Sequence, residues 1–421
     1  MNTLCIKSVK RPGARPVAGA AGGHARANRY RRDQTEGKIV IVLASSVVAL
    51  WAYLTVARGQ FWRARERDDG SDAPPAVWPR VTAIVPARDE ADSIAASIQS
   101  LLTQDYPGEF SIVLVDDQSR DGTADVARGT AESLGCGHKL DVVAGSTPPS
   151  GWTGKLWAQQ QGDSRADEFE PAYFLLTDAD IVHAPDTLRW LVAHTQARRL
   201  TLTSLMAKLR CESNSERLLI PAFIFFFQML YPFAWVNDPK RQTAAAAGGC
   251  MLVRREALRA AGGIAAIRGE LIDDCALART LKRIGPIWLG LTQRAHSTRP
   301  YPTMSDIGRM ITRSAYAQLD YSVLLLVGTI LGMTLIYLAP VLLALMASGV
   351  ERFVGVVCWI TMTLLFQPIL RFYRVSPLYG LLLPLIAAIY VWFTCASALQ
   401  HASGRGGMWK GRAQARVTRT P

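Results

Sequence analysis

Four pairs of acidic residues lie in order along the chain, and their types and spacing are suited to chemistry. The pairs are Asp89 with Glu90, Asp116 with Asp117, Asp178 with Asp180, and Asp273 with Asp274. Three of the four directly follow apolar runs rich in β-branched residues. Since the carboxyl ends of parallel strands meet at one edge of a sheet, we expect these carboxylates to gather there. Such a pocket suits a divalent metal ion together with a diphosphate.

The DAD sequence of Asp178 and Asp180 is the sharpest of these motifs. Two carboxylates on alternate residues supply hard oxygen ligands for one Mg²⁺ or Mn²⁺ that also binds a nucleotide diphosphate. The metal would neutralise charge on a departing diphosphate. The alternative is a helix N-cap with an acidic first turn. The apolar strand before the motif and the sequence that follows it favour the metal site.

The first two acidic pairs point to a nucleotide. The segment PARDEAD ends one predicted strand and opens a helix, so Asp89 or Glu90 either accepts hydrogen bonds from a nucleobase or ribose, or caps the helix. The segment VDDQSRDGT ends the next strand. Of Asp116 and Asp117, we expect one to face the nucleotide and the other to be structural.

Two further segments contribute candidate site residues. In GWTGKLWAQQQG, Lys155 stands where a helix begins and could pair with a phosphate, the alternative being a solvated lysine. In LIDDCALARTLKRIG, we expect Asp273 to cap a helix and Asp274 to project as a general base that deprotonates an acceptor hydroxyl. The small residues of AAAAGGCMLVRREAL, just upstream, would let a bulky ligand approach, and a short strand follows them.

The elements that position these residues have the pattern of an α/β fold. Candidate strands at 81–87, 111–117, 140–145 and 172–180 recur about every 30 residues, and the segments between them have helical periodicity. This spacing is typical of βαβ units in a mostly parallel sheet, so we predict a Rossmann-like sheet with flanking helices.

Long apolar runs on both sides of this domain predict membrane segments. The mean hydropathy is positive, at +0.12. The run 39–57 has no charge and is long enough for one transmembrane helix, and three more runs occupy 322–347, 353–370 and 377–399. The run 218–236 is equally long, but a crossing there would separate Asp178 from Asp274. We therefore predict an interfacial or re-entrant element, with a buried core helix as the alternative.

These observations divide the chain into six parts. We predict a basic disordered tail (1–38), a transmembrane helix (39–57), a linker (58–80), a catalytic domain (81–320) containing the interfacial segment 218–236, a C-terminal membrane bundle (321–400) and a second basic tail (401–421). The number of true spans and the side of the tails stay open, because three C-terminal spans would place the basic tail 401–421 outside, against the positive-inside tendency.

Charge and cysteine content limit the class of protein. The net charge is +13, but the two tails contribute +7 and +5, leaving about +1 for the rest. Basic tails beside apolar segments fit attraction to anionic lipid headgroups better than binding to nucleic acid. The alternative is that the tails only keep the chain soluble. We therefore expect a lipid bilayer as partner and no nucleic acid. Seven scattered cysteines without a CxxC pair fit reduced thiols in a cytosol-facing protein.

The order PARDE, VDDQS, GKxxA, DADxxxxPxxL and DD resembles the family 2 glycosyltransferases, which have the GT-A fold. The strings GWTGKLWA, LIPAFIFFFQMLYPFAWVNDP, LIDDCALA and WKGR are most similar to the bacterial hopanoid-biosynthesis-associated (hopene-associated) glycosyltransferases, from about Val81 to Arg412. The resemblance implies a nucleotide-sugar donor, a divalent metal, inversion at the anomeric carbon, and a hopanoid or isoprenoid membrane lipid as acceptor. It also implies a multi-pass protein of the bacterial inner membrane with a cytoplasmic catalytic domain.

Carried over by motif, the resemblance assigns Asp89 and Asp117 to the nucleotide, Asp178 and Asp180 to the diphosphate and metal, and Asp274 to the catalytic base. One segment departs from the pattern of membrane-bound relatives, which have QxxRW or RxxRW after the base. Here RMITRSAY keeps Arg313 for a phosphate but lacks the tryptophan. This disfavours a polysaccharide synthase and favours transfer of a single sugar. A non-catalytic scaffold for hopanoid enzymes is the other alternative, although every expected carboxylate is present.

Overall fold

Alternating apolar runs form one eight-stranded sheet in the computed structural model, which describes residues 20–404, 408–409 and 412–413. The strand order is β3-β2-β1-β4-β7-β6-β8-β5. The strands are β1 (Val81–Ala87), β2 (Phe110–Asp116), β3 (Leu140–Ala144), β4 (Tyr173–Thr177), β5 (Ile181–His183), β6 (Leu202–Lys208), β7 (Cys250–Arg254) and β8 (Ile287–Ser297). The four predicted strands are confirmed as β1 to β4, except that β4 ends before the DAD motif.

The register of the sheet brings most carboxyl ends to one edge. β1 pairs in parallel with β2 and β4, and β2 with β3. β7 runs antiparallel to both β4 and β6, so β6 points the same way as β4, and β8 is parallel to β6. β5 closes the other end, antiparallel to β8. The predicted α/β fold with a mostly parallel sheet is therefore confirmed, and the loops after β1, β2, β4, β6 and β8 share one edge.

Helices cover both faces of the sheet, because alternate strand residues point to opposite sides. In β1, Val81, Ala83 and Val85 pack against α2, α3 and α5, whereas Ile84 packs toward α4 on the other face. The helices of this domain are α2 (Ala91–Leu102), α3 (Thr123–Ser133), α4 (Gly154–Asp167), α5 (Thr187–Ala197), α6 (Asn214–Leu230), α7 (Phe233–Asn237), α8 (Arg255–Ala260), α9 (Asp273–Lys282) and α10 (Met304–Thr312). The face covered by α4 shares one core with the C-terminal helices.

The uncharged run 218–236 is not one continuous element. α6 ends at Leu230, and α7 starts after Pro232, whose ring cannot continue a helix. Much of α6, including Leu219, Ile224 and Phe225, is fully buried between the catalytic domain and the C-terminal helices. The buried-helix alternative therefore describes α6 better than an element lying on the bilayer surface, because protein rather than lipid covers much of its apolar surface.

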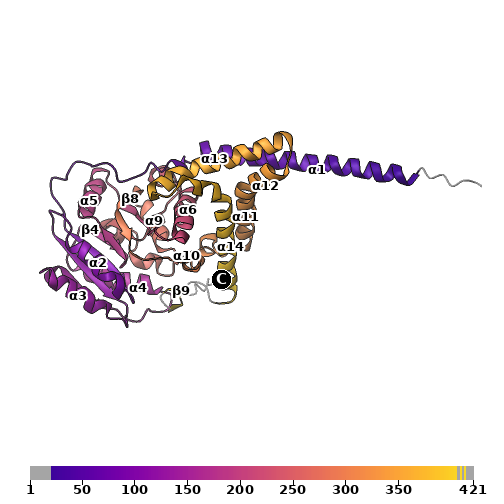
Figure 1. The fold of residues 1–421 in the computed structure, drawn as a ribbon. Helices are drawn as coiled ribbons and strands as arrows, with labels where there is room; N and C mark the ends of the chain where they lie inside the picture. The colour runs from indigo at the N-terminus through magenta and orange to yellow at the C-terminus, as the bar shows by residue number, and fades with distance from the viewer. Residues whose placement is uncertain (1–19, 405–407, 410–411, 414–421) are drawn as a thin grey trace, which may run out of the picture.

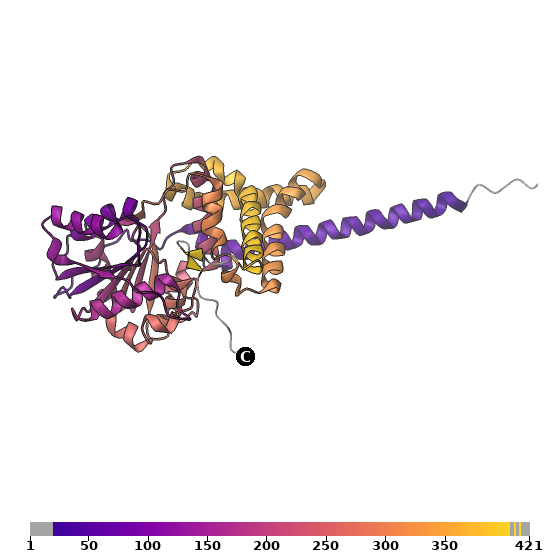
Figure 2. The ribbon, with the colours of Figure 1, turned by 90° about the horizontal axis from the view of Figure 1, so that it is seen from below.

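In the described part of the chain, four helical segments are long and apolar enough to cross a membrane: Gly37–Ala57, Val323–Met346, Gly349–Tyr373 and Pro377–Ala402. They comprise the end of α1 (Ala20–Ala52), α11 (Val323–Met333) with α12 (Ala339–Met346), α13 (Gly349–Tyr373) and α14 (Leu383–Ala402). Figures 1 and 2 both show α1 running beside α13, and this pair lying across the direction of α11 and α14.

The N-terminal tail differs in part from its predicted disorder. α1 begins at Ala20, so the described part of the basic tail 1–38 is helical, because it is rich in alanine, arginine and other good helix formers. The prediction for 1–19 lies outside the described residues. The linker 58–80 packs on the domain, with Asp68 buried and Arg67 bridged to Leu291. In the second tail, the described residues include a short ribbon of β9 (Met408–Trp409) and β10 (Arg412–Ala413).

Candidate active site

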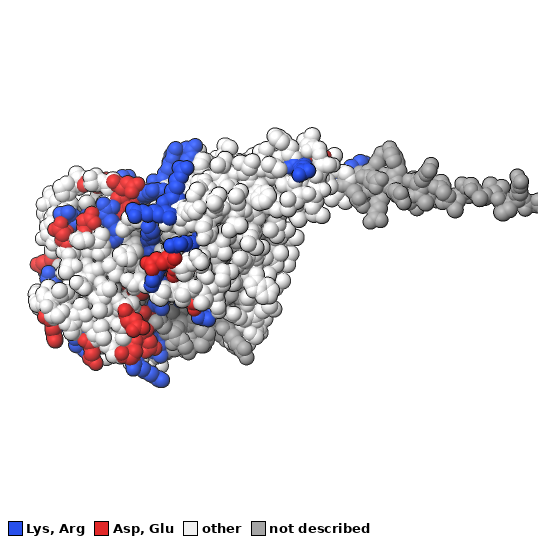
Figure 3. Space-filling model, in the orientation of Figure 1, with Lys and Arg blue, Asp and Glu red and all other residues white. Residues whose placement is uncertain are grey.

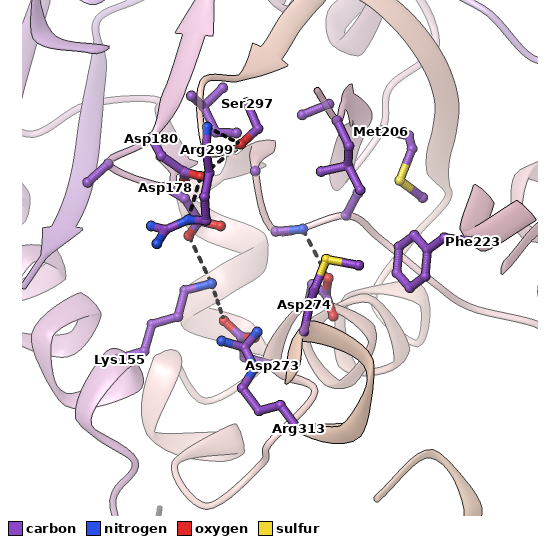
Figure 4. Close-up of a pocket in the computed structure, with 18 of the residues that line it drawn as sticks. Lys155, Asp178, Asp180, Met206, Phe223, Asp273, Asp274, Ser297, Arg299 and Arg313 are labelled. Carbon is purple, nitrogen blue, oxygen red and sulfur yellow. Dashed lines mark hydrogen bonds and ion pairs between the residues drawn. The ribbon is translucent and has the colours of Figure 1, made fainter. Parts of the chain in front are cut away.

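A cavity of about 630 Å³ opens at the shared carboxyl edge of the sheet (Figure 4). Its wall includes residues that follow β4 and β8, the first turn of α9, and parts of α6 and α10. The predicted site residues that line it are Glu90, Lys155, Asp178, Asp180, Asp273, Asp274 and Arg313. Segments far apart in the sequence therefore meet in one place, as the sequence analysis expected.

The DAD motif forms the turn between β4 and β5. The amide of Ile181 donates to the carbonyl of Asp178 at 3.2 Å, which closes the turn. Behind it, the Thr177 hydroxyl lies 3.0 Å from Nε2 of buried His183 and donates to the Gly249 carbonyl at 2.7 Å. Burial lowers the pKa of His183 to about 4, so this ring is neutral and structural. These contacts hold both carboxylates of the motif at the cavity wall, and the helix-cap alternative for the motif is wrong.

Lys155 lies between two of the carboxylate pairs. The side chain is 17% exposed, and its Nζ lies 2.9 Å from Oδ1 of Asp178 and 3.1 Å from Oδ2 of Asp273 (Figure 4). Burial opposes the charge on Lys155, but the surrounding carboxylates outweigh it and raise the pKa above its usual value. Lys155 is the second residue of α4, so its predicted place is confirmed. The solvated-lysine alternative is wrong, because the ammonium is held by two ion pairs.

Asp273 and Asp274 open α9 but contact different partners. The prediction that Asp273 caps the helix is wrong: Ile272 stands at the cap position, and the Asp273 carboxylate turns instead to the Lys155 ammonium. Asp274 accepts hydrogen bonds from the amides of Gly248 at 3.0 Å and Cys275 at 2.7 Å. Burial, followed by the charge of Asp273, raises the pKa of Asp274 to about 6. A carboxylate with this pKa is suited to accepting a proton near neutral pH.

Arg299 and Ser297 complete the wall around Asp180, and the sequence analysis missed both. Ser297 donates to Oδ2 of Asp180 at 2.8 Å, and Arg299 donates to the same oxygen at 3.1 Å. The other end of the Arg299 guanidinium donates to Oε1 of Glu90 at 2.6 Å. Both residues come from the carboxyl end of β8. Polar residues directly after an apolar run, in QRAHSTRP, were the signal that could have revealed them.

Glu90 stands at the N-cap position of α2, but its carboxylate makes no capping hydrogen bond. The first turn of α2 is held instead by Oδ2 of Asp121, which accepts from the Ala91 amide at 2.9 Å. The capping alternative for Glu90 is therefore wrong. The carboxylate is committed to Arg299 and lines the cavity.

Asp89, Asp116 and Asp117 lie beside the cavity, at the ends of β1 and β2, and do not line it. Asp89 has a left-handed backbone, with φ of 49°, and accepts from the Arg120 amide at 2.9 Å. Asp117 is fully buried, and its carboxylate lies 3.7 Å from Nη1 of Arg88. Asp116 is only half-buried and accepts from the Ser119 amide. Of Asp116 and Asp117, Asp117 is the more deeply buried, as expected for the structural member of the pair. The nucleotide contacts of Asp89, Asp116 and Asp117 stay predictions.

Arg313 follows α10 and lines the cavity on the side of Asp273 (Figure 4). Its side chain is exposed, and in the described part of the chain it has no ion pair with a carboxylate. The segment RMITRSAY thus places a cation where a phosphate could reach it. The position of Arg313 is consistent with its predicted phosphate role, which stays a prediction.

The carboxylates of Asp178 and Asp180 fit a divalent cation that shares its coordination with a diphosphate. Burial raises the pKa of Asp178; Lys155 lowers it, and the neighbouring charge of Asp180 raises it again. A divalent cation would relieve this repulsion. Within the described residues no three His, Cys, Asp or Glu side chains form a metal cluster. The protein therefore supplies too few ligands alone, and donor oxygens would have to complete the set.

The mixed sheet and the carboxylate cavity at its edge define a glycosyltransferase with the GT-A fold. The sequence model of the family described as "Glycosyltransferase like family 2" matches residues 79–292. The chain belongs to this family and is a family 2 glycosyltransferase. None of the curated proteins compared with the chain matches it.

The chain is similar to solved glycosyltransferase structures at low sequence identity. The mannosyltransferase PcManGT from Pyrobaculum calidifontis, in complex with GDP-Man and Mn²⁺, is 19% identical with a TM-score of 0.50, and the match covers 86% of this chain and 99% of that one. Glucosyl-3-phosphoglycerate synthase from Mycobacterium tuberculosis, with Mn²⁺ and UDP-glucose, is 18% identical with a TM-score of 0.38, covering 57% and 78%. TarS 1–349 from S. aureus, with UDP-GlcNAc, is 15% identical with a TM-score of 0.37, covering 81% and 97%. At 19% identity, the likeness to PcManGT shows the fold alone.

Proposed function

We propose that this family 2 glycosyltransferase is a membrane-bound, metal-dependent inverting enzyme that transfers one sugar from a nucleotide-sugar donor to a membrane lipid, in hopanoid biosynthesis. The observation that carries the proposal is the two-sided cavity. Carboxylates and cations occupy one side, and Met206, Phe223 and Phe227 form an apolar wall on the side of α6. A polar donor and an apolar acceptor would meet between them.

The donor side would be built from the acidic motifs. Asp178 and Asp180 would bind Mg²⁺ or Mn²⁺, which supplies neutralising charge for the diphosphate when bound. Lys155 and Arg313 would contact the phosphates. Asp89, Asp116 and Asp117, beside the cavity, would contact the nucleoside. Arg299 joins Glu90 to Asp180, so Glu90 would support the metal side of the cavity.

Asp274 would act as the general base and Asp273 would hold Lys155. The acceptor hydroxyl gives its proton to Asp274 as its oxygen bonds to the anomeric carbon, and the bond from that carbon to the diphosphate oxygen breaks. The nucleoside diphosphate leaves on the opposite side, so the configuration inverts. The amide of Gly248 holds one Asp274 oxygen and keeps the carboxylate facing the cavity.

The lipid acceptor is supported by the surroundings of the cavity. The small residues Ala246, Ala247 and Gly248 line it, which leaves room for a bulky ring system. α6, which carries the apolar wall, packs beneath α13 and α14, two helices long enough to cross a membrane. The hopanoid class of acceptor, the bacterial inner membrane and the cytoplasmic position of the catalytic domain rest on the sequence resemblance and are part of the proposal.

Labelled nucleotide sugars test the proposal. Membranes containing the full chain should form a labelled, solvent-extractable lipid when Mg²⁺ or Mn²⁺ is present. Asp274→Asn should lower the rate by about 100-fold or more, the usual contribution of a general base. The matched control is Asp125→Asn, an exposed carboxylate on α3, which should leave the rate unchanged.

Each assignment has its own contradicting result. Full activity in Asp274→Asn would remove the assigned base, and a fully restored lipid profile in a deletion strain complemented by that variant would favour a scaffold. Metal-dependent activity in Asp180→Ala would overturn the metal site. By mass spectrometry, the lipids of the deletion strain should lack one glycosylated hopanoid that the complemented strain contains. Loss of a different glycolipid would correct the acceptor.

A further inference from the structure

A second cavity, of about 550 Å³, lies beside the active-site cavity, and Leu209 and Ser297 line both. Its wall combines the end of β6 and the loop after it, the last part of β8, and Tyr373 at the end of α13. None of the acidic motifs lines it. The second cavity is therefore a separate space at the junction of the catalytic domain with the C-terminal helices.

The second cavity is basic, and its charge is not neutralised. Lys208 donates to Oε1 of Gln293 at 3.0 Å and lies over the rings of Phe372 and Tyr373, at 5.4 and 5.6 Å from their centroids. In the described part of the chain, no carboxylate pairs with Lys208. Burial lowers the pKa of Lys208, and the charge of Arg374 lowers it further, so a second cation lies near Lys208.

The remaining charged groups do not reverse this excess. Glu212 is the only carboxylate among the described residues that line the second cavity, and it pairs with Arg210 at 2.5 Å. On β8, His296 also faces the cavity, and its pKa is lowered by burial and by Lys208. An anion entering the cavity would therefore meet the Lys208 ammonium, which pairs with no carboxylate among the described residues. It would also meet the side chain of Gln293, one N–H of which is used by the Phe372 carbonyl at 3.4 Å.

The location of the second cavity indicates a lipid rather than a soluble anion. Figure 3 shows Lys and Arg side chains gathered where the charged catalytic domain meets the nearly uncharged surface of the C-terminal helices. Tyr373 ends a helix long enough to cross a membrane, and Leu364 and Leu378 near that end are 60% and 70% exposed. A cationic cavity beside exposed leucines matches a phosphate headgroup with attached apolar chains.

We propose that the second cavity binds the anionic phosphate headgroup of a membrane lipid. Lys208 would contact the phosphate oxygens and Gln293 would donate a hydrogen bond. Arg374, which directly follows Tyr373 and whose charge acts on Lys208, would add to the attraction without lining the cavity, and the lipid chains would lie along the C-terminal helices. Because Leu209 and Ser297 also line the active-site cavity, the lipid would be held next to the place of sugar transfer. This proposal does not depend on the donor or acceptor proposed above.

Binding to the full chain in detergent tests the site. Three probes would be titrated: dioctanoyl phosphatidylglycerol, dioctanoylglycerol, which lacks phosphate, and inorganic phosphate. We expect saturable binding of the phosphatidylglycerol, none of the dioctanoylglycerol, and at least tenfold weaker binding of inorganic phosphate. Lys208→Gln with Arg374→Gln should weaken phosphatidylglycerol binding by about 30-fold, from roughly 1 kcal/mol for each basic residue.

Two further variants keep the test decisive. Arg128→Gln removes an exposed cation on α3, away from the second cavity, and should bind like the wild type. Lys208→Arg keeps the charge and should retain most of the binding, which separates a lost contact from a misfolded chain. Equal phosphatidylglycerol binding in the double variant and the wild type would overturn the site. Equal affinity for inorganic phosphate and phosphatidylglycerol would overturn the lipid as its occupant.

Discussion

At the residue scale, more carboxylates than cations line the active-site cavity, and the cations are shared between carboxylates. Lys155 is shared by Asp178 and Asp273, and Arg299 is shared by Asp180 and Glu90. Each cation therefore links two acidic motifs that are distant in sequence. Among the described residues Asp274 makes no ion pair, although the charge of Lys155 acts on it, and its carboxylate is held by backbone amides. This difference explains why Asp274 is the carboxylate suited to taking up a proton.

The pH dependence of the reaction should report Asp274. Because burial and the charge of Asp273 raise its pKa to about 6, the base is protonated below that pH and kcat/KM should fall about tenfold per pH unit there. Asp273→Asn removes the neighbouring negative charge and should move the acid limb to lower pH. Rate profiles of both proteins from pH 4.5 to 8 measure this. An unchanged limb in Asp273→Asn would contradict the coupling between the two carboxylates.

Asp274 should also lower the stability of the fold at neutral pH. Its folded-state pKa lies above the ordinary value of 3.8, so the folded state is stabilised relative to the unfolded state only when the carboxyl is protonated. That advantage is complete below pH 4 and is lost as the pH rises through 6. Asp274→Asn should therefore raise the free energy of unfolding at pH 7 by on the order of 2 kcal/mol relative to the wild type, although the variant loses activity. Thermal unfolding at pH 7 and pH 4.5 checks this, since the gain should shrink at the lower pH.

Arg299 should position Asp180 rather than take part in the reaction. Its two hydrogen bonds join Asp180 and Glu90, and charge-assisted bonds of this kind contribute about 1.5–3 kcal/mol. Arg299→Gln should lower kcat/KM by about 10- to 100-fold and raise the Mg²⁺ or Mn²⁺ concentration needed for half-maximal rate. Arg128→Gln again serves as the control. An unchanged metal requirement would indicate a purely structural residue.

At the element scale, the close packing of α4 on the sheet positions Lys155. Thr153 caps the helix by accepting from the Leu156 amide, and Gly162 lets the helix approach β1 and β2. A Cβ at Gly162 would lie 2.5 Å from Cγ2 of Ile84 and 3.0 Å from Cγ2 of Val115. The helix would have to move away from the sheet, and Lys155 would move with it.

A pair of glycine substitutions tests this packing. Gly162→Ala should destabilise the chain by about 1–3 kcal/mol through overpacking. Gly129→Ala, in the middle of α3, places its Cβ in open space and should stabilise by about 0.5–1 kcal/mol, because alanine favours the helix. Thermal unfolding of the two variants in the same detergent should therefore shift in opposite directions. Shifts of the same sign would mean that α4 has room to move.

The strands that repeat as βαβ units were predictable, and the rest of the sheet was not. β1 to β4 are continuous apolar runs at regular spacing, and so the acidic pairs that follow them were found. β6 and β8 pair with each other in parallel, but the segments between them include antiparallel β7 and the helices α6 to α9. β8 also contains glycine and polar residues, so its sequence looks less like a buried strand. Ser297, Arg299 and Lys208 were missed because they depend on that long-range pairing.

At the scale of the whole molecule, the direction of the apolar helices limits how the chain meets a bilayer. Membrane-spanning helices tilt by about 0–40° from the membrane normal. α1 and α13 lie across α11 and α14 in both views (Figures 1 and 2), so the two pairs do not both stand along that normal. All four segments are long and apolar enough to span a membrane. Only the directions in which they pack show that they do not all stand along one membrane normal. We therefore expect one pair to span the membrane and the other to lie nearer its plane.

The buried position of α6 makes a sharper prediction about sidedness. Residues that precede α6 and residues that follow it in the sequence line the same cavity, so α6 should stay on one side of the membrane with both. Cysteines placed at Asp125, before α6, and at Glu256, after it, are both on exposed helix surfaces of the catalytic domain. In a cysteine-free background, a membrane-impermeant maleimide should label both cysteines in inside-out vesicles. It should label neither in cells whose outer membrane has been made permeable and whose inner membrane is intact. Labelling of the two positions from opposite sides would mean that α6 crosses the bilayer, and Asp178 and Asp274 would then belong to different sites. Labelling of both only in intact cells would keep the shared cavity but place the catalytic domain, and its nucleotide-sugar donor, outside the cytoplasm.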